Sequence, residues 1–347
     1  MPEFYDISIK EIQHETALAV SVFFDIPQNL KDTFSFTAGE YLTLEKEING
    51  EQVRRAYSIC SSPDSGSLCV AIKKVPSGLF SVDAVDNFKA GDSIKVAAPE
   101  GRFLLSPEAN KNYLAFAAGS GITPILSMIK SVLASESSST FTLIYGNKSV
   151  SDTMFYDELV SLSEEHDNFN LEFVFSRERN ADAKFGRIDK GLTNLFVKNK
   201  YNAISFNSAY VCGPEAMIET VSETLKDNGF SEDSIHFELF SVSVDEDSTA
   251  QIENGKCSVE VLLDDEVFTF EMDKSDDVLA ASLRNDVDAP YSCQGGVCSS
   301  CLAKVTEGKA VMAKNSILTN AEVEEGYILT CQAHPTTSTL KVDFDDV

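Results

Sequence analysis

Short segments of alternating apolar and polar residues fill the first part of the chain, up to about residue 105. Turn sequences such as Asn49-Gly50 and Ala90-Gly91-Asp92 separate these segments. Alternation with a period of two is typical of strands that bury one face, and many short strands between turns are typical of a closed antiparallel sheet. The expected strands are Tyr5–Ile12, Thr16–Phe24, Tyr41–Leu44, Arg54–Cys60, Ser67–Lys74 and Ser93–Ala97. Residues 1–107 are therefore predicted to form an antiparallel β-barrel.

The hydrophobic pattern changes near residue 110. Tyr113–Ala118 is a continuous apolar run, typical of a buried parallel strand, and apolar residues then recur at helical spacing from Ile125 to Leu133. Thr123 is expected to cap this helix and Pro124 to occupy its first position. Strands and helices continue to alternate at Thr140–Tyr145, Phe155–Glu165, Asn170–Phe175, Ala209–Cys212 and Glu215–Asn228. Residues 108–240 are therefore predicted to form an α/β, Rossmann-like domain.

A polar, acidic stretch over residues 241–255 predicts an interdomain linker. The last domain, residues 256–347, begins with an expected hairpin of Cys257–Leu263 and Val267–Met272. Ser275 is expected to cap a helix that runs through Arg284. Strands are expected near Ala303–Val305 and Leu340–Phe344. A short mixed sheet that clasps one helix indicates an α+β fold of the β-grasp type.

Composition and charge narrow the classes of partner. The 347 residues include 28 Lys and Arg against 55 Asp and Glu, a net charge of −27. Nucleic acid is excluded as a partner, because phosphate binding needs a basic surface. The charge fits general solubility or adaptation to a salty cell on the one hand, and an acidic docking face for a basic redox partner on the other. No apolar run is long enough for a membrane span, and the charged start of the chain is unlike a signal peptide, so a cytoplasmic location is expected.

Four of the eight cysteines form one motif. Cys293, Cys298 and Cys301 follow the spacing C-x4-C-x2-C, and Cys331 lies downstream. This is the plant-type ferredoxin spacing for a [2Fe–2S] cluster. Structural zinc and disulfides are the alternatives, although zinc sites usually show two C-x2-C pairs and disulfides are rare in the cytosol. The other four are expected to be buried as small apolar residues, with Cys212 a possible exception: Cys60, Cys69, Cys212 and Cys257.

Two motifs in the predicted barrel suit a phosphorylated planar cofactor. In an extended strand Arg55 and Tyr57 project to one face and Ser58 to the other. The guanidinium pairs with phosphate, the ring offers a stacking surface, and the hydroxyl can bond the edge of a ring system. Gly78 and Ser81 lie in a glycine turn that enters a helix, whose free N–H groups attract a pyrophosphate. Alone, either motif is also typical of ordinary surface.

The turn Gly119–Pro124 joins a strand to a helix, which is the phosphate-binding arrangement of nucleotide folds. Its pattern, G-x-G-x-x-P, differs from the dinucleotide fingerprint G-x-G-x-x-G. Ser176 and Arg177 follow another strand, and together with Arg187 they favour the 2′-phosphate of NADPH over NADH. The alternative is that Arg177 is an ordinary surface arginine. Ligands of such sheets gather at the carboxyl ends of the strands, where four residues lie: Gly119, Gly146, Ser176 and Gly213.

These motifs resemble those of the ferredoxin–NADP⁺ reductase superfamily. Arg55–Ser58 matches its R-x-Y-S flavin motif, Gly119–Pro124 its nicotinamide motif and Cys212–Pro214 its C-G-P motif. The order flavin, nicotinamide and C-terminal ferredoxin resembles the reductases of multicomponent oxygenases, in particular those of phenylacetyl-CoA epoxidases. Tyr57–Cys60, His236–Phe240 and Tyr291–Cys298 also fit that subfamily.

The resemblance implies an FAD-binding barrel, an NAD(P)-binding domain and a [2Fe–2S] ferredoxin domain. It implies cluster ligands at Cys293, Cys298, Cys301 and Cys331. It implies catalytic positions near the flavin at Tyr57, Ser58, Cys212, Glu238 and Phe240. It implies cofactor-binding positions at Arg55, Tyr57, Ser58, Gly78, Ser81, Gly119, Gly121, Thr123, Pro124, Ser176, Arg177, Gly213 and Pro214. FAD is favoured, although the related phthalate-type reductases use FMN.

The implied activity is electron transfer from NADPH through FAD and the cluster to a separate oxygenase, with a di-iron phenylacetyl-CoA epoxidase as the favoured partner. A Rieske-type dioxygenase, a demethylase or a carotenoid-type hydroxylase, with FMN and NADH, is the alternative within this class. An alternative of another class is a binding module that holds structural zinc in the cysteine loop.

Overall fold

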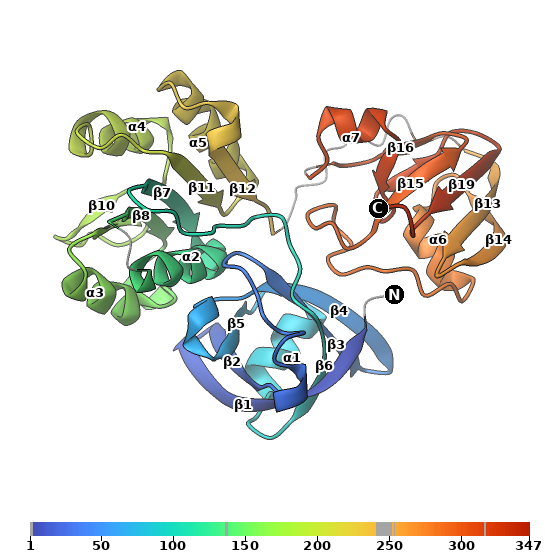
Figure 1. Cartoon of the computed structure of the whole chain (residues 1–347), viewed down its shortest axis with the longest axis horizontal. Helices are drawn as coiled ribbons and strands as arrows, with labels where there is room; N and C mark the ends of the chain where they lie inside the picture. The colour runs from blue at the N-terminus through green and yellow to red at the C-terminus, as the bar shows by residue number, and fades with distance from the viewer. Residues whose placement is uncertain (1–2, 136–137, 241–251, 253, 316) are drawn as a thin grey trace. The chain divides into compact units, whose positions relative to one another are not determined.

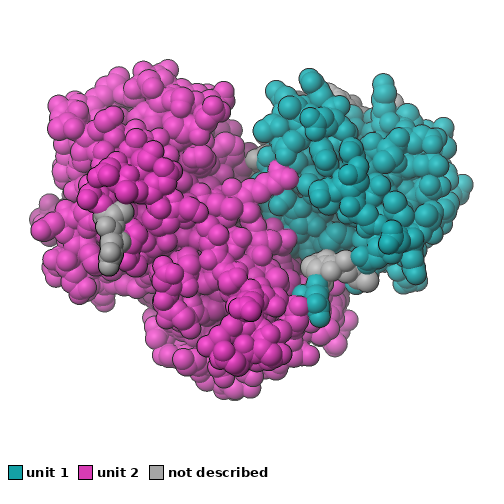
Figure 2. Space-filling view, viewed as in Figure 1, with its two compact units in different colours: residues 1–3, 241–347 teal, residues 4–240 magenta. Residues whose placement is uncertain are grey.

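The computed structural model describes residues 3–135, 138–240, 252, 254–315 and 317–347. The chain divides into two compact units, Phe4–Phe240 and a second that comprises Met1–Glu3 and Ser241–Val347 (Figure 2). Most of the predicted linker, residues 241–251 and 253, lies outside the described residues.

The first sheet of the unit Phe4–Phe240 is a six-stranded antiparallel barrel in the order β4-β3-β6-β1-β2-β5 (Figure 1). A bridge between Ile59 and Val70, beyond the end of β4, joins it to β5 and closes the sheet. Ile7 and Ile9 alternate with exposed residues along β1 and fill the interior. The elements are β1 (Phe4–Thr16), β2 (Ala19–Asp25), β3 (Tyr41–Ile48), β4 (Glu51–Ser58), β5 (Leu68–Lys73), α1 (Leu79–Asn87) and β6 (Ser93–Ala97).

The first hairpin differs from the predicted one. Thr16 ends β1 and pairs with Ala19, so that Ala17 and Leu18 form the turn. The prediction placed Thr16 at the start of the second strand, because neither turn residue is a glycine, proline or asparagine that marks a turn in the sequence.

The second sheet is six-stranded and parallel, in the order β10-β9-β8-β7-β11-β12. The chain runs from β7 outward through β8, β9 and β10 and then returns to the other side of β7 with β11. This reversal is a topological switch point between β7 and β11, where open α/β sheets bind ligands. Helices α2 and α3 lie on one face and α4 and α5 on the other (Figure 1). The elements are β7 (Asn112–Ala118), α2 (Ile122–Ala134), β8 (Thr140–Asn147), α3 (Tyr156–Glu165), β9 (Phe169–Phe175), β10 (Ala183–Phe185), α4 (Lys190–Asn194), β11 (Ser208–Cys212), α5 (Glu215–Asp227) and β12 (Ile235–Glu238).

Helix α2 begins earlier than predicted. Gly119–Gly121 forms a 3₁₀ turn that runs directly into the helix at Ile122, so Thr123 lies within the first turn and is not its cap. The Thr123 hydroxyl instead donates to the carbonyl oxygen of Ser120, at 3.0 Å. A side chain that satisfies a carbonyl of the preceding turn does not serve the helix N–H groups, so the expected capping role of Thr123 was wrong.

The barrel and the α/β domain share one buried cluster. Cys60 and Cys69 of the barrel belong to the same apolar core as Ile125 and Met128 of α2. Gly39 lies at this joint, where a Cβ atom would come within 1.9 Å of the Phe103 carbonyl oxygen. The two domains therefore pack as one body around residues with no room for larger side chains.

The second unit carries a five-stranded mixed sheet in the order β14-β13-β19-β15-β17 and a two-stranded sheet of β16 and β18. The β13–β19 pair is parallel and the other pairs are antiparallel, as expected for a β-grasp fold. Asp277 caps α6 by accepting from the Ala280 N–H at 2.7 Å, so the predicted cap, Ser275, was wrong by two positions. The elements are β13 (Lys256–Leu263), β14 (Glu266–Asp273), α6 (Val278–Arg284), β15 (Leu302–Glu307), β16 (Ala310–Met312), α7 (Asn320–Glu324), β17 (Tyr327–Leu329), β18 (Ala333–Pro335) and β19 (Thr339–Asp343).

Within the described residues, every helix is too short or too polar to cross a lipid bilayer.

Leu126→Ala is expected to lower the free energy of unfolding of the unit Phe4–Phe240 by about 2–5 kcal/mol, because truncating a fully buried leucine leaves a cavity. Urea unfolding followed by far-ultraviolet circular dichroism measures the loss. Leu18 is 46% exposed, and Leu18→Ala is the matched control, with an expected change within about 0.5 kcal/mol. A Leu126→Ala protein as stable as the control would contradict the packing of α2.

Candidate functional site

The R-x-Y-S motif occupies the end of β4, where the barrel meets the second domain. Tyr57 lies against Phe80 of α1, with ring centroids 5.6 Å apart and planes tilted by 40°. Burial raises the pKa of Tyr57, so its hydroxyl stays protonated. Arg55 is half-buried and donates to the Arg54 carbonyl oxygen at 2.6 Å. The end of β4 therefore carries an aromatic ring and a guanidinium, the two groups of the flavin motif.

The turn into α1 is tight. Gly78 precedes the helix, and a Cβ atom there would lie 2.5 Å from Cγ2 of Val75 and 2.6 Å from Oγ of Ser81. The Ser81 hydroxyl accepts from the Val75 N–H at 3.2 Å, which holds the turn in place. Gly78 and Ser81 thus lie together at a helix N-terminus, where backbone N–H groups favour an anion.

Three predicted residues from distant parts of the chain meet at the junction of the barrel and the parallel sheet. The Ser58 hydroxyl lies 3.4 Å from Oε2 of Glu238, and Cys212 is the register partner of Glu238 in β11 and β12. Burial raises the pKa of Glu238 to about 8, and the hydrogen bond from Ser58 opposes this shift. Burial also raises the pKa of Cys212, to which the neighbouring Glu238 adds. At neutral pH the carboxyl therefore holds its proton.

Phe240 lies two residues beyond Glu238 and is 39% exposed. Within the described residues it has no ring contact with another aromatic side chain or with a cation. The structure therefore brings Ser58, Cys212 and Glu238 together and leaves the Phe240 side chain at the surface of its own unit.

The glycine turn Gly119–Gly121 lies at the switch point of the parallel sheet. A Cβ atom on Gly121 would lie 2.2 Å from the Cys212 carbonyl oxygen, so only glycine allows the turn to approach β11 this closely. A Cβ atom on Gly213 would lie 3.1 Å from Cβ of Ala118, and Pro214 directly precedes α5. These contacts place the G-x-G-x-x-P and C-G-P motifs side by side.

The sequence did not single out three further residues in this region. Tyr145 and Lys73 contact the turn, and Asn147 ends the neighbouring strand β8. The Tyr145 hydroxyl donates to the Gly119 carbonyl oxygen at 2.9 Å. The Lys73 ammonium lies near Gly119, 3.6 Å from where a Cβ atom would stand, and burial lowers its pKa. Among the residues that the structure describes, none is a hydrogen-bond partner of the buried Asn147 side-chain nitrogen. Asn147 could have been predicted as a site residue, because it follows a strand of the parallel sheet. Lys73 could not, because it belongs to the barrel and no sequence pattern connects it with this turn.

Ser176 and Arg177 follow β9 at the same edge of the sheet. The Ser176 N–H donates to the Asn147 carbonyl oxygen at 3.0 Å and the Arg177 N–H to that of Lys148 at 2.9 Å. The Arg177 and Arg187 side chains are exposed. The backbone is thus fixed while the arginine side chains point into solvent, where an anionic group can reach them.

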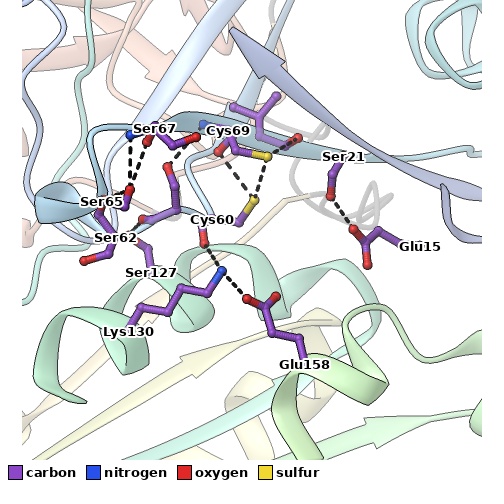
Figure 3. Close-up of polar contacts among 12 residues, drawn as sticks. Glu15, Ser21, Cys60, Ser62, Ser65, Ser67, Cys69, Ser127, Lys130 and Glu158 are labelled. Carbon is purple, nitrogen blue, oxygen red and sulfur yellow. Dashed lines mark hydrogen bonds and ion pairs between the residues drawn. The ribbon is translucent and has the colours of Figure 1, made fainter. Parts of the chain in front are cut away.

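Figure 3 shows how α2 is attached to the barrel just after the flavin motif. Lys130 of α2 donates to the Cys60 carbonyl oxygen at 3.4 Å and forms an ion pair with Glu158 at 2.7 Å. Ser127 donates to the Ser61 carbonyl oxygen at 2.7 Å. The Cys60 and Cys69 sulfurs lie 3.6 Å apart, and all four cysteines outside the loop are buried, as predicted. These bonds hold the switch point against the end of β4.

The four cysteines of the loop motif gather in the second unit as two pairs. Sγ of Cys298 lies 3.0 Å from Sγ of Cys293, and Sγ of Cys301 lies 3.3 Å from Sγ of Cys331. Hydrogen bonds from Cys298, from Cys331 and from backbone N–H groups of the loop lower the pKa of Cys293. Two thiolates for each of two metal ions is the ligand set of a [2Fe–2S] cluster, so the residues fit that group.

The barrel and the sheet also offer polar groups that a bound nucleotide cofactor can satisfy. The Ser62 hydroxyl, four residues after Ser58, and the Asn147 amide nitrogen are buried without hydrogen-bond partners among the described residues. Buried polar groups are normally paired, so these two groups suit a polar ligand.

Comparison with known families divides the chain in the same way. Residues 7–104 match an oxidoreductase FAD-binding domain, residues 116–223 an oxidoreductase NAD-binding domain and residues 261–336 a 2Fe-2S iron-sulfur cluster binding domain.

Curated relatives match over the full length. The chain is 37% identical over 352 residues to one subunit of the 1,2-phenylacetyl-CoA epoxidase of Escherichia coli (strain K12), covering 99% of each chain. It is 31% identical over 358 residues to the ferredoxin reductase component of 3-ketosteroid-9-alpha-monooxygenase of Rhodococcus rhodochrous, covering 97% of this chain and 96% of that one. Among solved structures, phthalate dioxygenase reductase superposes with a TM-score of 0.64 at 25% identity and 98% coverage of both chains.

An FAD-binding barrel, an NAD-binding α/β domain and a C-terminal 2Fe-2S domain occur here in one chain, and the match to these relatives runs over nearly their full length. The chain therefore belongs to the flavin- and NAD-dependent oxidoreductases that serve as the reductase components of multicomponent oxygenases.

Proposed function

We propose that this protein transfers electrons from NADPH through FAD and a [2Fe–2S] cluster to a separate oxygenase component. The observation that carries the proposal is the meeting of Ser58 from the barrel with Cys212 and Glu238 from the parallel sheet. A hydroxyl of the flavin motif and a thiol of the C-G-P motif thus each lie next to the same protonated carboxyl, which supports a shared flavin and nicotinamide site. The domain limits that go with the proposal are residues 1–107, 108–240, 241–255 and 256–347.

In the barrel, Arg55 binds the flavin phosphates and Tyr57 packs on the ring system. Gly78 and Ser81 receive the pyrophosphate at the N-terminus of α1, the feature that distinguishes FAD from FMN. Ser58 donates to the edge of the ring system, and Glu238 holds a proton behind it, since its pKa of about 8 keeps the carboxyl neutral at pH 7. Phe240 covers the flavin beyond the end of β12.

In the α/β domain, Gly119, Gly121, Thr123 and Pro124 form the turn that holds the nicotinamide nucleotide. Cys212, Gly213 and Pro214 approach the nicotinamide from the end of β11. Ser176 and Arg177 bind the 2′-phosphate, because a guanidinium forms charge-assisted hydrogen bonds with phosphate oxygens. This contact is the basis for preferring NADPH to NADH.

In the second unit, Cys293 and Cys298 hold one iron and Cys301 and Cys331 the other, following the sulfur pairs of the structure. The flavin supplies two-electron to one-electron conversion and the cluster supplies one-electron transfer, while the protein supplies position and electrostatics.

We propose a di-iron phenylacetyl-CoA epoxidase as the oxygenase partner, on the basis of the full-length similarity to a component of the E. coli enzyme. The second unit carries seventeen Asp and Glu against seven Lys and Arg over residues 256–347, which suits a partner with a basic docking surface. Reconstitution with the oxygenase components of the E. coli epoxidase, NADPH and phenylacetyl-CoA tests this proposal. Oxygen uptake with those components but not with a ketosteroid oxygenase supports it, and the reverse preference contradicts it.

An anaerobic titration with NADPH, followed by visible absorption, tests the cofactor assignment. Bleaching of both flavin and iron–sulfur absorption is expected. A protein with flavin but without iron and sulfide would contradict the assignment of the cysteine loop.

Cys298→Ser is expected to leave the reduction of the flavin by NADPH intact and to lower cytochrome c reduction by at least about tenfold, because only the one-electron exit passes through the cluster. Stopped-flow absorption measures the first rate and a steady-state assay the second. Cys257→Ser is the matched control, since Cys257 is a buried cysteine of the same unit outside the loop. Equal loss of both rates would show that the order of electron transfer is wrong.

The stability of the unit Phe4–Phe240 is expected to fall with rising pH because of Glu238. Below about pH 4.5 the carboxyl is protonated in both the folded and the unfolded chain, and above about pH 8 it is ionised in both. Between these values only the folded chain holds the proton, so the free energy of unfolding declines by up to about 1.4 kcal/mol per pH unit. Glu238→Gln removes this contribution. Urea unfolding of both proteins across this range measures it, and identical pH slopes would contradict it.

Arg177→Ala is expected to raise the KM for NADPH by about tenfold or more and to leave the KM for NADH unchanged, because NADH has no 2′-phosphate. Steady-state kinetics of flavin-dependent ferricyanide reduction measures both constants. Lys198→Ala is the matched control, an exposed cation of the same domain. If the two coenzymes lose affinity equally, Arg177 does not distinguish them.

A further inference from the structure

The cysteine loop contains a buried serine that nothing in the described part of the protein satisfies. Ser292 directly precedes Cys293 and is 1% exposed. Its hydroxyl has no hydrogen-bond partner among the described residues. Buried hydroxyl groups are normally paired, so an unpaired one indicates a partner that is not part of the polypeptide.

Two other buried hydroxyl groups of this unit have partners within the protein. Thr330, which precedes Cys331, is fully buried and donates to the Cys301 carbonyl oxygen at 3.0 Å. Ser282 of α6 is equally buried and donates to the Val278 carbonyl oxygen at 2.8 Å. The hydroxyl groups of Thr330 and Ser282 thus each donate to a carbonyl oxygen, whereas the equally buried hydroxyl of Ser292 has no such partner among the described residues.

The chemistry around Ser292 identifies the kind of partner. Backbone N–H groups of the loop already converge on sulfur, since Gly295 donates to Sγ of Cys293 at 3.3 Å. An anionic sulfur is a hydrogen-bond acceptor, and a cluster of two irons, two sulfides and four thiolates carries net negative charge. Cys293, one of the proposed cluster ligands, directly follows Ser292, and its Sγ lies 3.0 Å from Sγ of Cys298. The acceptor sulfur would therefore belong to the cluster that the neighbouring residue holds.

We propose that the Ser292 hydroxyl donates a hydrogen bond to a sulfur of the iron–sulfur cluster and thereby raises its reduction potential. A donor stabilises the reduced, more negative cluster more than the oxidised one, and hydrogen bonds to sulfur are among the factors that set such potentials. Ser292 is a positioning and tuning residue and not a metal ligand. The inference rests on the proposed cluster at Cys293, Cys298, Cys301 and Cys331.

The test is a set of spectroelectrochemical titrations on the full-length holoprotein. Ser292→Ala is expected to shift the equilibrium between reduced and oxidised cluster toward the oxidised form by about tenfold, a fall of about 59 mV in potential for one electron. Ser292→Thr keeps the hydroxyl and is expected to stay within about twofold of wild type, about 18 mV. Ser282→Ala is the matched control, because it removes a buried hydroxyl of the same unit that already has a protein partner.

A second measurement does not depend on potential. Electron–nuclear double resonance of the reduced cluster, recorded in H₂O and in D₂O, is expected to show one exchangeable proton coupling fewer in Ser292→Ala than in wild type or Ser282→Ala. A Ser292→Ala cluster with the wild-type potential and the wild-type couplings would overturn the proposal.

The iron and sulfide content of each variant shows whether the cluster assembles, and this result also tests the proposal. Ser292→Gly also lacks the hydroxyl, and it replaces Ser292→Ala in both measurements if that variant does not hold iron. If neither variant holds iron and sulfide while Ser292→Thr does, the requirement for the hydroxyl is supported. If Ser292→Thr fails as well, the position is one of packing and the proposal is overturned. Iron and sulfide analysis of the wild-type protein distinguishes these results from failure of the proposed function, in which the wild type itself would contain no cluster.

Discussion

The packing of α2 against the end of β4 is the contact on which the candidate flavin and nicotinamide site depends. Ser127 and Lys130 of the helix bond to carbonyl oxygens that directly follow the flavin motif, while Gly39 admits the Met128 side chain between the domains. The other end of α2 begins at the glycine turn of the nicotinamide motif. One helix therefore fixes the distance between two motifs that belong to different domains. A larger side chain at Gly39 would separate them, because protein interiors leave no spare volume.

The same packing explains the state of Glu238. Its carboxyl lies in the last strand of the parallel sheet and is buried where the barrel covers that strand. Removal from water disfavours the ionised form, and the single hydrogen bond from Ser58 does not offset that penalty. The protein thus carries a neutral carboxylic acid at a cost in stability, an arrangement that is typical of groups that hold or pass a proton. No cation pairs with Glu238 in the described part of the chain, and burial is the main cause of its raised pKa. The carboxyl therefore keeps its proton at neutral pH only while the barrel covers it.

Motifs of adjacent residues could be read from the sequence, and contacts between distant residues could not. The alternation of apolar residues located the barrel, and the apolar run at Tyr113–Ala118 located the parallel sheet, because each reports one local period. The contact between Ser58 and Glu238 joins residues 180 positions apart, and only the resemblance to a known family suggested it. The capping errors at Thr123 and Ser275 have a common cause. Several residues near each helix start can accept or donate, and tertiary packing decides which of them does so.

The cysteine loop shows how a short motif acquires its geometry from the rest of a domain. Gln294 and Gly296 both have positive φ, at 54° and 70°, so the backbone between the first two cysteines curls through conformations that few residues adopt. A Cβ atom on Gly296 would lie 2.9 Å from Cγ of Gln332, which places the loop directly against the residue after Cys331. The Thr330 N–H and hydroxyl both donate to the Cys301 carbonyl oxygen at 3.0 Å. The residues on either side of the fourth cysteine therefore contact the loop, Thr330 through its hydrogen bonds to Cys301 and Gln332 through its side chain. Cys293, Cys298, Cys301 and Cys331 would hold the cluster, and the contacts of Thr330 and Gln332 would keep the fourth ligand beside the other three.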